Sequence, residues 1–195
     1  MEEIISQNVS ETRENYYFAS DEDYYVSFTD GMRESSYVMD GKSSPLVEYG
    51  VLVLKTSKNL GENPRYILKV GEKEYSGNME INPFDLTYVA DISQKIENFQ
   101  EISLFLPNFN KNFILTCISS SWEITPTKAL NIFIQEKYQA LKPYFENEAK
   151  AEIYVKLVGD KSDPNNIFYY ILCVTQDGEV MGSLIDVHTG STTQK

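Results

Sequence analysis

The order of elements between residue 125 and residue 190 is the feature that most constrains this fold. Thr125 stands directly before Pro126, a pair that suits the N-cap and first turn of a helix, where a missing N–H costs nothing. Apolar residues then recur on one stripe at helical spacing, namely Leu130, Phe133, Ile134, Tyr138, Leu141 and Phe145. The pattern predicts one amphipathic helix, which Pro143 kinks or ends near Lys142.

Three strand-like segments follow this helix. Residues 151–157 alternate apolar and polar side chains, as in a strand with one buried face. After a polar loop, residues 167–175 form a nearly continuous apolar run that suits the centre of a sheet. Gln176-Asp177-Gly178-Glu179 then turns the chain into residues 180–187, which predicts a hairpin.

The first 122 residues carry short strand signals separated by turn residues. Residues 1–13 predict a frayed end or a short helical turn, residues 93–99 predict one helical turn, and Asp30-Gly31 and Asp40-Gly41 are typical of hairpin turns. The predicted strands are 14–20, 24–29, 46–56, 65–70, 73–79, 87–92, 101–106 and 112–121. Strands at this spacing indicate a β-sandwich or a partly open barrel.

These elements predict an α+β fold. We expect an antiparallel β-rich part, a sandwich or an open barrel, over residues 1–122. One amphipathic helix and a three-stranded antiparallel sheet follow over residues 123–195, as a second domain. In the alternative, the helix covers the N-terminal sheet.

The C-terminal order of helix, strand, strand, tight turn and strand resembles the PepSY domain. In that family a helix packs across a small antiparallel sheet whose last strand often ends in an Asp/Thr-Gly turn. The matching pieces are 128–141, 152–158, 168–175, Asp177-Gly178, and 185–190 with Asp186, Thr189 and Gly190. PepSY domains are associated with secreted or membrane-anchored bacterial proteins and with inhibition or regulation of peptidases. The resemblance therefore implies a non-catalytic module and brings no catalytic residue to this protein.

The formal net charge of −12, from 17 basic and 29 acidic residues, limits the partners. Such an excess repels phosphate backbones and disfavours nucleic-acid binding. It fits a soluble surface, a basic protein partner, or a nucleic-acid mimic with its carboxylates on one face.

The first residues have no basic segment and no long apolar core, so they do not predict a signal peptide. No run approaches the ~18 apolar residues that span a bilayer. We therefore expect a cytoplasmic protein, or an extracytoplasmic one if a leader has been removed.

Recognisable catalytic motifs are missing from the sequence. His188 is the one histidine, and Asp186 shares its strand face, but no nucleophile turn or oxyanion loop accompanies them, which favours a solvated turn histidine. Residues 160–166 are rich in oxygen ligands but lack the EF-hand spacing, which favours a turn over a Ca²⁺ site. The glycines stand singly, without a phosphate-binding loop. We predict no catalytic residue, no metal site and no cofactor.

Carboxylates near an aromatic residue occur at Asn82-Pro83-Phe84-Asp85, with Asp91 on the next strand. A glycosidase uses such a pair, but Asx-Pro turns give the same pattern. Asp21-Glu22-Asp23 predicts a solvated turn between strands.

Tyrosines crowd the first strands, and adjacent pairs such as Tyr24-Tyr25 must point to opposite faces of a sheet. We select Tyr17, Tyr25 and Tyr37 as candidate binding residues, because an exposed tyrosine buries much area at a small entropy cost. The alternative is cross-strand aromatic packing. Cys117 and Cys173 lie in apolar runs and predict two buried thiols, with one bridge as the alternative.

The sequence therefore predicts a non-enzymatic binding or regulatory protein that contacts a protein or peptide partner. Two alternatives stay open. A carboxylate-dependent hydrolase requires two acidic side chains close together in a cleft. An acidic mimic or immunity-type inhibitor requires one strongly negative face and a basic partner.

Overall fold

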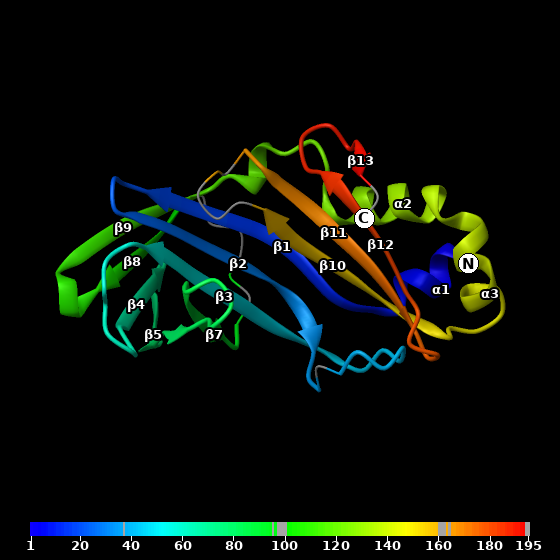
Figure 1. Cartoon of the computed structure of the whole chain (residues 1–195), viewed down its shortest axis with the longest axis horizontal. Coiled ribbons are helices and arrows are strands. Elements are labelled where there is room, and N and C mark those ends of the chain that lie inside the picture. The colour runs from blue at the N-terminus through cyan, green and yellow to red at the C-terminus, as the bar shows by residue number, and fades with distance from the viewer. Residues whose placement is uncertain (37, 95, 97–100, 160–162, 164, 194–195) are drawn as a thin grey trace.

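A computed structural model describes residues 1–36, 38–94, 96, 101–159, 163 and 165–193 of the protein. Within these residues, thirteen strands belong to one sheet and three α-helices lie beside it (Figure 1). The predicted α+β, β-rich class is confirmed, and the antiparallel strands form a nearly closed, barrel-like arrangement.

The long strand β1 (Val9–Ser20) connects the two halves of the sheet. Along one side it pairs antiparallel with β2 (Tyr24–Glu34), which pairs in turn with β3 (Leu46–Thr56). Along its other side β1 has two successive neighbours. Its first residues run parallel to β10 (Ala151–Gly159), and Tyr17 and Phe18 pair with β9 (Lys111–Cys117). The strands β1 and β10 therefore diverge beyond the Thr12–Val155 pair (Figure 1).

The remaining N-terminal strands complete the barrel-like half. They are β4 (Arg65–Val70), β5 (Lys73–Asn78), β6 (Glu80–Ile81), β7 (Tyr88–Ile92) and β8 (Glu101–Leu106). The strand β8 pairs with both β4 and β9, β4 and β5 form a hairpin, and β7 extends the sheet next to β3. Side chains from these strands and from β1, β2, β3 and β9 enclose one hydrophobic core, which includes Tyr17, Phe28, Leu52, Leu68, Leu104 and Leu115.

A second core lies under the helices. The strands β11 (Ile167–Thr175), β12 (Val180–Asp186) and β13 (Thr192–Thr193) follow β10 in an antiparallel series. The helices α1 (Glu2–Ser6), α2 (Pro126–Glu136) and α3 (Tyr138–Phe145) lie beside this end of the sheet (Figure 1). Buried apolar residues join them to the strands, among them Ile5, Phe133, Phe145, Ile153 and Ile171.

Several predicted elements need correction. The helix does start at Pro126, and Thr125 Oγ1 accepts the N–H of Lys128. It breaks at Lys137, however, and α3 then continues past Pro143 to Phe145. Leu141 and Phe145 are buried, as the stripe predicts, whereas Tyr138 at the start of α3 is exposed, and the proline is not the end point.

The strand β1 begins at Val9, five residues before the predicted start, because polar Ser10 and Glu11 are buried in the sheet. Asp30-Gly31 is not a turn: β2 runs straight through it. A Cβ atom on Gly31 would lie 1.8 Å from the carbonyl oxygen of Thr12, so glycine allows β1 and β2 to approach closely here. The turn expected at 93–99 lies mostly outside the described residues.

Candidate functional site

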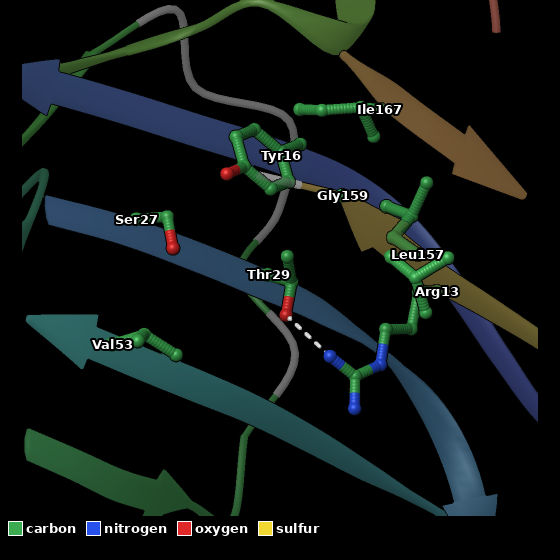
Figure 2. Close-up of a pocket in the computed structure, with 9 residues that line it drawn as sticks. Arg13, Tyr16, Ser27, Thr29, Val53, Leu157, Gly159 and Ile167 are labelled. Atoms are coloured by element: carbon green, nitrogen blue, oxygen red, sulfur yellow. Dashed lines mark hydrogen bonds between the residues drawn. The ribbon is translucent and has the colours of Figure 1, made fainter. Parts of the chain in front are cut away.

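A pocket lies where β1 and β10 diverge. Its volume is about 300 Å³, at the small end of the range for ligand pockets. The described residues that line it come from β1, β2, β3, β10 and the start of β11, and no acidic side chain is among them: Arg13, Tyr16, Ser27, Thr29, Val53, Leu157, Val158, Gly159 and Ile167 (Figure 2). We call it the divergence pocket.

Arg13 forms the polar end of the divergence pocket, held by three side chains. Its Nε donates to Glu11 Oε1 and to the hydroxyl oxygen of Tyr49, each at 3.0 Å. Its Nη1 donates to Thr29 Oγ1 at 3.3 Å (Figure 2). The O–H of Tyr49 donates to Glu11 in turn. The guanidinium is therefore fixed in one orientation before any ligand arrives.

The charge of Arg13 is maintained by its neighbours. Burial acts to lower the pKa of Arg13, but the Tyr49 oxygen and the Glu11 carboxylate raise it above its ordinary value. Burial raises the pKa of Tyr49, which therefore stays a neutral phenol. Lys156 Nζ lies 3.5 Å from Glu11 Oε2. Two cations thus surround one carboxylate, which leaves one net positive charge at this end of the pocket.

Aliphatic side chains and the ring of Tyr16 line most of the rest of the divergence pocket, together with Ser27. Leu157 and Ile167 are buried, and Val53 of β3 lies across from them (Figure 2). Tyr16 packs its ring against Trp122 with centroids 5.9 Å apart, which holds this wall in place. Apolar walls with a few fixed polar groups are typical of a ligand site.

A separate buried cluster surrounds Ser10. Its hydroxyl lies 2.9 Å from Glu34 Oε1 and 2.8 Å from Glu152 Oε2. The connection between β2 and β3 closes over it, because the N–H of Gly41 donates to Glu152 and the N–H of Ser44 donates to Glu34. Ser10, Glu34 and Glu152 are all buried, so this cluster fastens the connection to the sheet. A glycosidase, in contrast, needs its carboxylates in an open cleft.

The three predicted binding tyrosines are not brought together in the described structure. Tyr17 is completely buried in the barrel core, with its ring 6.1 Å from that of Phe28, which is the cross-strand packing of the alternative. Tyr25 is partly buried, and the Lys55 ammonium lies 6.0 Å from its ring centre. Tyr37 lies outside the described residues.

His188 and Asp186 form a turn. Asp186 Oδ1 accepts the N–H groups of His188 and Thr189 and the Thr189 hydroxyl. Burial acts to raise the pKa of Asp186, but these hydrogen bonds lower it below its usual range. The carboxylate thus binds the backbone, and the imidazole packs edge-on against Trp122.

The other predicted acidic residues also serve turns or surface pairs. Asp85 accepts the N–H and hydroxyl of Thr87, and Asn82 accepts the N–H of Phe84. Asp91 pairs with Arg33 at 3.0 Å.

Asp163, the described acidic residue of the polar loop, accepts two hydrogen bonds from Asn165; residues 160–162 and 164 lie outside the described part. The described residues hold no group of three His, Cys, Asp or Glu side chains placed for a metal ion. Cys117 and Cys173 are both buried and free, as expected.

Sequence reasoning missed the divergence pocket because its residues come from five strands. One signal was present: Glu11 and Arg13 are two residues apart and share a strand face, where opposite charges pair. That signal became useful only once the strand was known to start at Val9.

Comparison with known proteins gives no relative: no family model, no curated protein and no solved structure matches the sequence. None of the helices in the described ranges is long and apolar enough to cross a membrane.

Proposed function

We propose that this protein is a non-enzymatic binding protein that takes up a short extended segment of a protein or peptide partner in the divergence pocket. The observation that carries the proposal is the pocket itself, with a fixed cation at one end and aliphatic side chains along its walls. The pocket opens where β1 and β10 diverge, so an extended ligand can lie between these two strands.

The edge of β10 beyond Val155, which has no paired strand among the described residues, supports an extended ligand. Beyond Val155, β10 continues to Gly159 with β11 on one side, and among the described residues no strand pairs with its other side. Such an edge offers backbone N–H and C=O groups to an added strand. Leu157 and Gly159, from this same stretch, line the pocket, so backbone pairing and side-chain insertion are available together.

A peptide selection tests this function. The intact protein is immobilised and exposed to a random pentapeptide library, alongside a Val53→Trp variant that fills the pocket and a Val47→Trp control. Val47 lies on the same strand but is exposed, so its indole leaves the pocket open. We expect peptides that the wild type and the control retain and the filled variant loses. Equal retention by all three proteins, or by none, would refute the proposal.

A further inference from the structure

We infer that the group bound at the Arg13 end of the divergence pocket is a carboxylate, followed by a branched apolar side chain between Val53, Leu157 and Ile167. It comes from the free C-terminus of a peptide or from a free aliphatic acid. This inference rests on the proposed function and names the ligand chemistry of the same pocket.

The polar groups at this end are hydrogen-bond donors. Thr29 Oγ1 accepts Arg13 Nη1 and keeps its own O–H as a donor (Figure 2). Arg13 uses Nε and Nη1 on its neighbours, and its Nη2 has no partner in the described part of the protein. Ser27 lies on the same face of β2 but two residues further from Arg13, beside Val53, so it belongs to the other end of the pocket (Figure 2). An ionised carboxylate only accepts hydrogen bonds, so it complements this set.

The local charge selects a monoanion. Arg13 and Lys156 carry two positive charges around the one negative charge of Glu11, in a protein whose net charge is −12. A neutral amide leaves the surplus charge unpaired, whereas a phosphate dianion exceeds it. One carboxylate balances it.

The size and shape of the pocket limit the group attached to the carboxylate. About 300 Å³ holds a small acid or one terminal residue, and Val53, Leu157 and Ile167 give the pocket aliphatic walls. A peptide that enters along the edge of β10 would place its last side chain against Leu157 and Ile167 and its terminal carboxylate at Arg13.

Three probes test the inference by NMR titration of the intact protein: N-acetyl-Gly-Gly-Leu, the same peptide as a C-terminal amide, and 4-methylpentanoate. A charge-assisted hydrogen bond contributes about 1.5–3 kcal/mol, so we expect the acid to bind at least about tenfold more tightly than the amide. Equal affinity of acid and amide overturns the carboxylate while leaving the pocket as a binding site. Shifts at none of the pocket residues, or displacement of the acid by equimolar phosphate, also overturn the inference.

The two sources of the carboxylate are separated by the same titration. Tighter binding of the peptide acid than of 4-methylpentanoate assigns the ligand as the C-terminus of a peptide. Equal or tighter binding of the free acid assigns a small aliphatic acid. Both results support the carboxylate.

Two variants locate the contact. Arg13→Lys keeps a positive charge beside Glu11 but loses the fork of guanidinium donors, so the acid-to-amide ratio should fall towards one. Thr29→Val keeps the shape of the side chain and removes this hydroxyl, so it should weaken binding of the acid about threefold to tenfold and leave the amide unchanged. Thr116→Val, at an exposed strand threonine, is the matched control and should change neither. An unchanged ratio in folded Arg13→Lys protein would overturn the assignment.

Discussion

Replacing Glu11 by glutamine tests whether this carboxylate holds the centre of the sheet together. Glu11 is 2% exposed, lies 3.0 Å from Arg13 and 3.5 Å from Lys156, and accepts the hydroxyl of Tyr49. Glutamine keeps the size and an acceptor oxygen but removes the negative charge. The Arg13 guanidinium is then left among neutral groups.

The expected loss of stability follows from the exposure of the two cations. Removing one partner of a fully buried ion pair costs about 3–5 kcal/mol. Arg13 and Lys156 retain 23% and 21% exposure of their side chains, so water screens part of the unpaired charge. We therefore expect the free energy of unfolding to fall by about 2–4 kcal/mol, within the ~5–15 kcal/mol that a domain commonly has.

Urea unfolding measures this loss. With a denaturant slope of about 2 kcal/mol per molar, the midpoint should fall by roughly 1–2 M and the slope should stay the same. The control is Glu74→Gln, which breaks a surface pair with Lys69 whose side chains are 57% and 52% exposed, and should cost less than about 1 kcal/mol. A Glu11→Gln midpoint no lower than that of Glu74→Gln would refute the role of Glu11 as a buried counter-ion.

Three further outcomes follow from burial and close packing. Burial raises the pKa of Asp30 to about 6, so between about pH 4 and pH 6 the folded state holds a proton that the unfolded state releases. The free energy of unfolding of the wild type, relative to that of Asp30→Asn, should therefore fall by up to ~3 kcal/mol as the pH rises from about 4 to about 6. Urea titrations that show a rise would contradict this. Gly31→Ala should lose at least about 3 kcal/mol in the same assay, since its Cβ meets the Thr12 carbonyl, and a loss below about 1 kcal/mol would count against the close approach of β1 and β2. Burial raises the pKa of the Cys173 thiol to about 12, so Ellman's reagent should leave both Cys173 and Cys117 unmodified until denaturant is added; rapid reaction of the native protein disproves their burial.

Local pattern is enough to place many of the elements. The bounds of β3 (46–56), β4 (65–70), β8 (101–106) and β11 (167–175) agree with those predicted from the sequence. In each case an apolar or alternating run ends at residues with turn chemistry, so neighbouring positions alone fix the strand. The Thr125 cap is local in the same sense, because the hydroxyl and the N–H it accepts are three residues apart.

Long-range pairing is not predictable in this way. The parallel pairing of β1 with β10 depends on residues that are far apart in the sequence, and polar Ser10 and Glu11 give no sign of burial. Gly31 next to Asp30 has the composition of a turn, and only the closeness of Thr12 in the folded sheet explains it as a strand glycine.

The candidate site is the least predictable part. Arg13 resembles any charged residue near a polar end until Leu157 and Ile167 are placed beside it. The tyrosines show the opposite case. Tyr17 attracts attention by composition, yet strand alternation places its ring in the barrel core and that of Tyr16 in the other core.

The divided pairing of β1 has a consequence for synthesis of the protein. Val9 pairs with Ile153, which is 144 residues later in the sequence (153 minus 9). At about 5–20 residues per second, ribosomes need roughly 7–29 seconds to make the intervening segment. During that time β2 can cover one edge of β1 and β9 can cover the end of the other edge, but the first residues of β1 wait for β10.

The polar stretch Ser10-Glu11-Thr12-Arg13 suits this delay, because charged side chains along an open strand discourage pairing with other nascent polypeptides. The same polar residues that make the start of β1 hard to predict would thus keep this strand soluble until β10 is made.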